Sequence, residues 1–298
     1  MTATLPPHLE HDERSEVDGA VGKGSSRARK AFVYFLLIVF AFIFIYPFII
    51  QFVTSFKTNT DAVENSLRLI PNPFDTGAWS RLRDTNFPRW FLNSTVVTLT
   101  VTTFRVLFAS MAGYALARLK FRGRDAIFTS LLALMAVPGI VLLIPKFLVL
   151  NELNIYNTYS AMILPLVVDA AGVFIMRQFF LQIPVSVEEA ARIDGAGPFR
   201  TFWYIVLPMA KPALITVTIL SFQGSWNELG HYIIAVQDPK LFPLTRGVAG
   251  LTSGQLGSGS QFPITMAAGL LMTIPTAVVF VFFQRFFTQG ANVGAEKG

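Results

Sequence analysis

Long apolar stretches with few charges recur along the chain and alternate with polar segments. About 20 apolar residues in a helix cross the roughly 30 Å of hydrocarbon in a bilayer. The pattern therefore predicts an all-α membrane protein whose six transmembrane helices form one domain over residues 31–288. The six predicted spans are residues 31–56, 91–117, 127–150, 160–181, 213–235 and 263–287.

The segments outside these spans differ in length and charge. Residues 1–30 are polar and low in aromatic residues, which predicts a disordered cytoplasmic tail. Residues 289–298 form a second predicted tail, and residues 57–90 and 237–262 are the two long outer loops. Residues 118–124 hold four positive charges, and such clusters mark cytoplasmic loops. The charge bias predicts a multi-pass membrane protein with both termini in the cytoplasm.

Composition narrows the class of protein further. The chain is 53% hydrophobic and 14% charged, whereas a soluble domain has about 25% charged residues. Its net charge of +6 comes from basic residues beside apolar runs, which indicates orientation in membrane lipid and no nucleic-acid binding. Without cysteine there is no disulfide and no thiolate metal site, and the three scattered histidines form no metal-ligand cluster.

The polar loop between the fourth and fifth spans, residues 183–210, has an organised pattern. Its first half is rich in helix formers, and Glu188 and Glu189 stand in the first turn, where the helix dipole favours acids. Gly195 can end that helix, and Pro198 can begin the next one. The pattern predicts a short surface helix, a sharp bend and a second helix that returns to the bilayer. The plain alternative is a loop that only joins two spans.

A longer motif runs through this loop. Glu189-Ala190-Ala191 is followed after three residues by Gly195, and after nine more by Ile205-x-Leu207-Pro208. This complete E-A-A-x3-G-x9-I-x-L-P pattern resembles the EAA loop of permease subunits in bacterial ATP-binding-cassette (ABC) importers. Further matches resemble the sugar-type permeases, similar to the maltose G-subunit and the glycerol-3-phosphate importers, at Asn93-Ser94, Ala112 to Arg118, Trp226-Asn227 and Gln284 to Phe287.

The resemblance implies a type I ABC importer permease fold in a bacterial plasma (inner) membrane, with a cytoplasmic coupling helix between spans 4 and 5. It implies a second permease subunit that completes the translocation path as a heterodimer, two cytoplasmic ATPase subunits and an extracytoplasmic solute-binding protein. The implied cargo is a small-molecule sugar or polyol, or a glycerol-phosphate ester. The residues that would carry the ATPase contact are Glu188, Glu189, Ala190, Ala191, Asp194 and Gly195.

The chain itself is expected to hold no cofactor and to be no enzyme. A phosphate-binding G-x-x-x-x-G-K-[ST] loop does not occur in it, so the resemblance assigns ATP and Mg²⁺ to a partner subunit. A membrane-embedded enzyme would need a Ser/His, His-cluster or paired-acid site at bilayer depth. His231 is the sole histidine there, and nothing completes such a site.

Two charged residues are predicted at similar depth inside the bilayer, Arg105 in the second span and Asp169 in the fourth. A charge at that depth usually faces protein or water, so we expect the two side chains to pair. Such a pair either fixes helix packing or lines the path of the solute.

The outer half of the predicted fifth span holds Trp226, Asn227, Glu228 and His231. An aromatic face beside amide and carboxylate groups suits a sugar, which offers hydroxyls and apolar C–H faces. The alternative is an aromatic belt at the membrane interface, where Trp is common. The Gly- and Ser-rich residues 247–262 either probe a binding protein or serve as a plain linker.

An ion-coupled secondary transporter of small polar solutes is the competing interpretation. Such proteins use paired intramembrane acids or broken helices at equivalent positions of internal repeats, and the sequence has no convincing repeat. The EAA loop favours the importer, because only an importer needs it. The residues do not choose among sugars, polyols and glycerol-phosphate esters.

Overall fold

The computed structural model describes residues 27–252 and 261–295, and all regular structure in these residues is helical. The chain divides into two compact units, residues 1–50 and residues 51–298. The prediction of an all-α fold is confirmed for the described residues.

The first unit contains most of α2 (Arg27–Thr54), a helix with one internal proline, Pro47. Its side chains are apolar on every side, and large exposed ones run from Phe32 to Phe48. A helix that is apolar all round belongs in lipid, because no face of it is suited to water.

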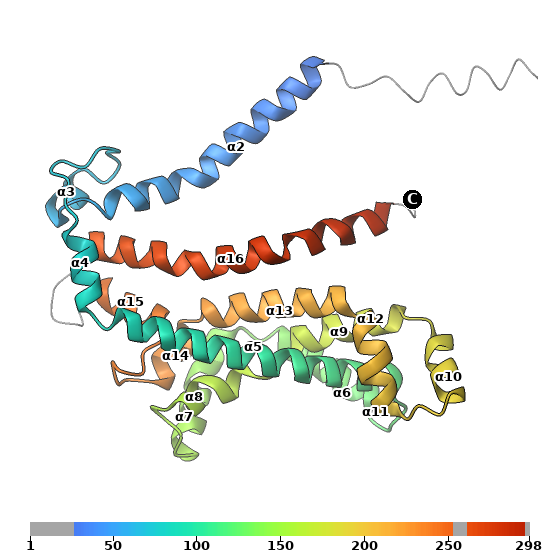
Figure 1. Ribbon diagram of the computed structural model, residues 1–298. Coiled ribbons are helices and arrows are strands. Elements are labelled where there is room, and N and C mark those ends of the chain that lie inside the picture. The colour runs from blue at the N-terminus through green and yellow to red at the C-terminus, as the bar shows by residue number, and fades with distance from the viewer. Residues whose placement is uncertain (1–26, 253–260, 296–298) are drawn as a thin grey trace, which may run out of the picture. The chain divides into compact units, whose positions relative to one another are not determined.

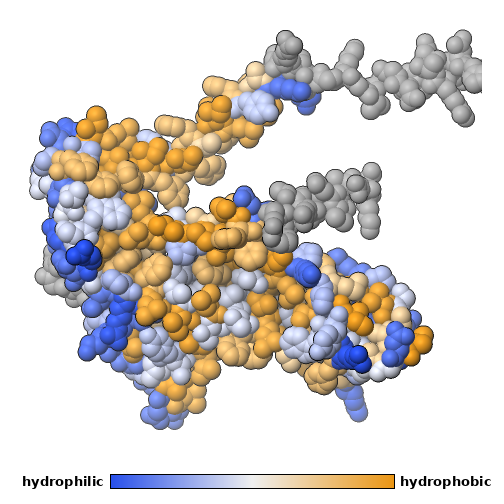
Figure 2. All heavy atoms as spheres, viewed as in Figure 1, coloured by the Kyte–Doolittle hydropathy of each residue, from blue (hydrophilic) through white to orange (hydrophobic). Residues whose placement is uncertain are grey.

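The second unit is built around three helices, α5 (Phe87–Arg118), α9 (Ala170–Gln182) and α13 (Lys211–Trp226), which pack against one another (Figure 1). α16 (Phe262–Ala295) packs along α13. On the face drawn in Figure 2, apolar side chains cover much of α16, and hydrophilic ones gather near α4 and near α10 and α11 at the opposite end.

Small residues allow α5 and α9 to approach closely. A Cβ atom built on Gly113 in α5 would lie 2.7 Å from the Cβ atom of Met176 and 2.9 Å from the backbone nitrogen of Arg177 in α9. Helices in lipid associate through such close contacts, because apolar lipid supplies no hydrophobic driving force between them. The Gly113 position therefore fixes the distance between α5 and α9.

Four described helices are long and apolar enough to cross a membrane, and up to six spans result if each of two bent pairs counts as one. One pair is α6 (Arg124–Met135) with the segment formed by η1 (Gly139–Leu142) and α7 (Leu143–Glu152), bent by 99°. The other pair is α13 with the segment before it, bent by 80°, and that segment consists of α11 (Pro198–Thr201), η3 (Phe202–Val206) and α12 (Leu207–Met209). The count of six spans remains a prediction.

The fourth span is interrupted in its middle. α8 (Tyr159–Ile163) continues into the short turn η2 (Leu164–Leu166), and α9 begins only at Ala170. Between them Asp169 has extended backbone angles. The predicted fourth span, residues 160–181, corresponds to the candidate span Tyr159–Gln182, and the break lies within it.

The fifth span also ends earlier than the sequence pattern predicts. α13 stops at Trp226, and α14 (Gly230–Ala235) is a separate short helix. The physical reason is a local capping bond, because the Glu228 carboxylate accepts a 2.8 Å hydrogen bond from the His231 backbone N–H. Acidic and polar side chains that bind backbone groups in this way favour a new helix start over continuation.

Helices extend into both of the predicted tails. α2 begins at Arg27, so the predicted tail of residues 1–30 is wrong for its last four positions, and residues 1–26 lie outside the described residues. α16 continues to Ala295, so the predicted tail at residues 289–298 is helical over most of its length. Gly290 does not end the helix.

The two predicted outer loops contain helices of their own. Residues 57–90 hold α3 (Asn59–Glu64) and α4 (Gly77–Asp84) before α5 begins. In the second loop α15 (Leu244–Thr252) packs on α5 and α16, and residues 253–260 lie outside the described residues.

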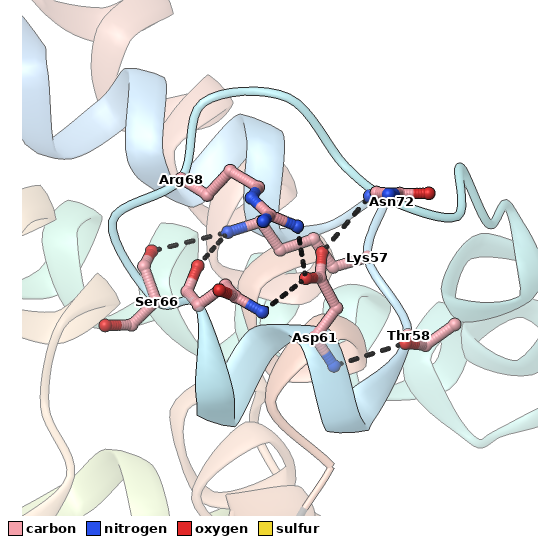
Figure 3. Close-up of polar contacts among 7 residues, drawn as sticks. Lys57, Thr58, Asp61, Ser66, Arg68 and Asn72 are labelled. Carbon is pink, nitrogen blue, oxygen red and sulfur yellow. Dashed lines mark hydrogen bonds and ion pairs between the residues drawn. The ribbon is translucent and has the colours of Figure 1, made fainter.

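A polar network holds the first outer loop together (Figure 3). The fully buried Lys57 donates from Nζ to the carbonyl oxygen of Asn65 at 2.7 Å. The buried Asp61 carboxylate accepts from Asn65 Nδ2 at 3.0 Å and from the Asn72 backbone N–H at 3.3 Å, and it pairs with Arg68 at 3.6 Å. These bonds satisfy two buried charges, which would otherwise be costly.

Replacing Gly113 with alanine is expected to destabilise the α5–α9 contact by roughly 1–3 kcal/mol, the usual cost of overpacking. The thermal unfolding temperature of the purified protein in detergent measures the effect. Gly139→Ala is the matched control, because no heavy atom lies within 4 Å of its added Cβ. Equal unfolding temperatures for the two variants would contradict the close packing.

Candidate functional site

The loop after the fourth span contains the predicted short helix, α10 (Val185–Ile193). Gly195 follows with a positive φ of 79°, and its backbone N–H donates to the Arg192 carbonyl at 3.1 Å. The Ala196 N–H donates to the Ala191 carbonyl at 2.9 Å. Glycine adopts this left-handed conformation without strain, so it terminates the helix and turns the chain. The predicted helix and bend are confirmed.

The six candidate coupling residues lie on two different sides of this region. Glu189, Ala190, Asp194 and Gly195 are exposed. Ala191 and Glu188 are buried, with 4% and 8% of their surface exposed. The exposed side is thus the one that α10 can present to a soluble protein, and the two buried residues face the rest of the chain.

Two large apolar side chains flank the exposed residues. Ile193 is 86% exposed at the end of α10, and Phe199 is 77% exposed in α11 (Pro198–Thr201). The sequence interpretation missed both of them. Their signal was an apolar residue on either side of a Gly-rich bend in an otherwise polar loop.

Glu188 joins α10 to the C-terminal end of α5. Its carboxylate lies 2.9 Å from Arg118 Nε, and the two side chains are 11% and 9% exposed. Tyr114 Oη donates to the other carboxylate oxygen at 3.3 Å. Arg118 also donates to the backbone carbonyl of Ile183, the residue that ends α9.

The break in the fourth span positions the candidate charges inside the membrane. Arg105 Nε donates to the Leu166 carbonyl at 2.8 Å, and Asp169 Oδ2 accepts from the Gly172 backbone N–H at 2.9 Å. Lipid offers no partner to backbone groups at a helix break, so these side chains supply one. The described residues contain no Arg105–Asp169 ion pair within 4.0 Å, and the predicted direct pair is wrong.

Two of the candidate solute-path residues are buried in the core. Trp226 is 2% exposed, stacks on Phe222 and donates from Nε1 to the Met272 carbonyl at 3.0 Å. His231 is 1% exposed, and its Nε2 lies 2.9 Å from the Ala161 carbonyl oxygen. In the described chain these two side chains contribute to packing, and their predicted contact with a solute has no exposed surface to support it.

An exposed surface at the end of α13 and directly after it, called here the exposed polar face of α13, includes residues on both sides of Trp226 in the sequence. Gln223, Gly224 and Asn227 are exposed, while Glu228 is half-buried. A Cβ atom on Gly224 would lie 3.6 Å from Arg105 Nη1, so the guanidinium of Arg105 reaches this face. Asp169 and Glu228 also lie close enough to interact electrostatically with this guanidinium, so Arg105, Asp169 and Glu228 are the sequence candidates around one half-exposed region. Asn227 is exposed and donates to the Gln223 carbonyl.

Residues 106–293 match the model of the family described as "Binding-protein-dependent transport system inner membrane component". The chain belongs to this family. The match contains the fourth span, α10 with its EAA pattern, α13 and most of α16. This permease family is a family of transporters, and its members are multi-pass proteins of the inner membrane.

Curated relatives agree over most of the chain. The permease is 33% identical to the arabinooligosaccharides transport system permease protein AraQ of Halalkalibacterium halodurans. The alignment of 262 residues covers 87% of this chain and 93% of the relative. It is 30% identical to the sn-glycerol-3-phosphate transport system permease protein UgpE of Yersinia pestis, over 91% of this chain and 98% of the relative.

A solved structure confirms the fold. The permease matches a chain in the crystal structure of a bacterial ABC transporter involved in the import of the acidic polysaccharide alginate. The TM-score is 0.75 and the identity 25%, with 89% of this chain and 100% of that chain covered. The predicted ABC importer permease fold is thereby confirmed.

The described residues contain no group of three or more metal-binding side chains. The two acidic residues near Arg105, Asp169 and Glu228, accept hydrogen bonds from backbone N–H groups at helix starts.

Single cysteines placed on α10 are expected to differ sharply in their reaction with a membrane-impermeant maleimide. In inside-out vesicles that contain the permease alone, Ala190→Cys reacts readily because position 190 is exposed. Ala191→Cys is protected, because only 4% of the native side chain is exposed. The native chain has no cysteine, so the background is low. Equal labelling of both positions would contradict the orientation of α10.

Proposed function

We propose that this permease is the transmembrane subunit of an ATP-driven, binding-protein-dependent carbohydrate importer. The observation that carries the proposal is α10, whose exposed Glu189, Ala190 and Asp194 lie in the complete EAA pattern. The family match supports it. So do the names of relatives that transport arabinooligosaccharides, polygalacturonan and rhamnogalacturonan, or sn-glycerol-3-phosphate. The cargo is therefore a sugar, a polyol or a glycerol-phosphate ester.

The ATPase is a separate cytoplasmic subunit, present in two copies, which binds ATP and Mg²⁺. Its contact on this chain is the exposed side of α10, residues Glu189, Ala190, Asp194 and Gly195, with Ile193 and Phe199 as apolar anchors. Exposed apolar side chains rimmed by polar ones are typical of a protein interface. The acids at the start of α10 and the glycine turn hold these anchors in fixed positions.

The remaining partners follow from the same assembly. A second permease subunit covers the exposed polar face of α13, because amide and charged groups are costly against lipid. An extracytoplasmic binding protein delivers the solute to the outer loops, which the network at Lys57 and Asp61 keeps folded. Four positive charges in residues 118–124 support a cytoplasmic location for the α10 side and for both termini.

The solute path in this chain runs beside Arg105. Within the described part of the chain neither Nη atom of Arg105 donates a hydrogen bond, so these donors are available to a solute oxygen. Asp169 and Glu228 lie close enough to interact electrostatically with the guanidinium. Sugar hydroxyls both donate and accept, so they can bind carboxylates and a guanidinium together. Trp226 and His231 support this wall from the core.

Substituting Ile193 with aspartate is expected to abolish co-purification of the ATPase, because it places a charge at an apolar anchor. In an assembly that carries Ala190→Cys as its single substitution, the bound ATPase is also expected to protect this cysteine from maleimide. Ile70→Asp is the matched control, since Ile70 is an isoleucine of similar exposure, 77%, on the first outer loop. Retention of the ATPase by Ile193→Asp at wild-type levels would contradict the proposed contact.

Replacing Arg105 with glutamine is expected to lower saccharide uptake about tenfold, the effect of losing one charged hydrogen bond of roughly 1.5 kcal/mol. Uptake is measured for whichever compound the wild type accepts from a panel of neutral and acidic oligosaccharides. Arg89→Gln is the control, because Arg89 lies at the outer end of the same helix and binds the Lys240 carbonyl. Unchanged uptake in Arg105→Gln would remove Arg105 from the path.

A further inference from the structure

Glu188 is unlike the exposed residues that follow it in the EAA pattern. It is 8% exposed, and its carboxylate turns toward α5 and away from the surface that α10 offers to the ATPase. A charged side chain is almost never this buried unless it is paired. Its function therefore concerns the inside of this chain.

Arg118 is the central member of the contact. It pairs with Glu188 in α10 and donates to the carbonyl of Ile183, where α9 ends and α10 begins. One guanidinium thus binds both the start of the loop and the helix within it. Tyr114, one turn earlier in α5, binds the second oxygen of the same carboxylate.

The Tyr114 hydroxyl donates a hydrogen bond to one carboxylate oxygen, and the Arg118 guanidinium forms an ion pair with the other. Two contacts, one to each oxygen, restrain the position of the carboxylate more than either contact alone. The pair is also largely dehydrated, so separating the two charges would leave each of them buried and unpaired. It therefore costs less free energy for α10 and the end of α5 to move together than for α10 to move alone.

α5 is a single helix from Phe87 to Arg118, and it carries the movement of one end to the other. Arg105 lies on it about 20 Å from Arg118, at 1.5 Å per residue. The same helix therefore connects the contact at α10 with the helix break at Leu166 and with the polar face of α13.

We propose that Tyr114, Arg118 and Glu188 form a joint that converts movement of α10 into movement of α5 within the membrane. These are positioning residues for transport, and they contact neither nucleotide nor solute. The inference rests on the proposed function, because it takes the ATPase as the source of the movement. It assigns Glu188 to the inner side of the coupling helix and leaves the ATPase contact to the exposed residues.

The test follows α5 by electron paramagnetic resonance in the complete transporter with its ATPase. Spin labels at Thr103→Cys in α5 and Ile274→Cys in α16 report one distance within the chain, and both positions are exposed. The distance is compared without nucleotide and after trapping with ATP and vanadate. The amounts of co-purified ATPase and of trapped nucleotide are measured on the same samples.

The decisive variant combines Arg118→Met with Glu188→Gln, because removing both charges leaves no lone buried ion. We expect it to retain ATPase and trapped nucleotide but to lose more than half of the distance shift seen in the wild type. Arg124→Gln is the matched control, since it removes an arginine from an exposed ion pair near the same end of α5. The control keeps the full shift.

A full wild-type shift in the double variant would overturn the joint and leave Arg118–Glu188 as packing alone. Where the double variant does not assemble, Glu188→Asp decides, because it keeps the charge but withdraws the carboxylate from Arg118. The joint then predicts a reduced shift at normal nucleotide trapping, and an undiminished shift overturns it. Failure of the wild type itself to retain an ATPase would instead overturn the proposed function.

Discussion

The bilayer offers no hydrogen-bond partner to a protein backbone, and this constraint explains most of the structure. Continuous helices satisfy it by themselves, as α2 and α5 do. Where the fourth span is interrupted, Arg105 takes the Leu166 carbonyl and Asp169 takes the Gly172 N–H. A charge at bilayer depth thus stabilises an irregular backbone, and that irregular backbone creates the polar region that a solute path requires.

The sequence predicts the fold well because lipid imposes a simple rule on composition. Apolar length identifies the spans, and the loop that contains Glu189 and Gly195 identifies the family, since helix formers and a glycine turn are local signals. Pro165 is a local signal for the interruption before Asp169, because proline removes a backbone donor from a helix. Burial is different, because it depends on tertiary contacts. Nothing in the pattern marks the burial of Trp226 or the backbone partners of Arg105 and Asp169, and the predicted Arg105–Asp169 pair failed for this reason.

The candidate site has two regions, both on the C-terminal half of α5. At the C-terminal end Arg118 holds the buried side of α10, while the opposite side of α10 stays exposed. Further along, Arg105 reaches the exposed face of α13. A rigid helix between the proposed ATPase contact and the proposed solute path meets the minimal requirement for coupling, since energy released in one place must change the geometry of another.

The central claim is that the exposed side of α10 is the contact for a separate ATPase. A single-particle structure of the assembly extracted from its native membrane tests it most directly. The account predicts a cytoplasmic nucleotide-binding subunit against Glu189, Ala190 and Ile193, with a second permease beside the exposed face of α13. An assembly in which α10 faces solvent and no nucleotide-binding subunit is present would contradict the account.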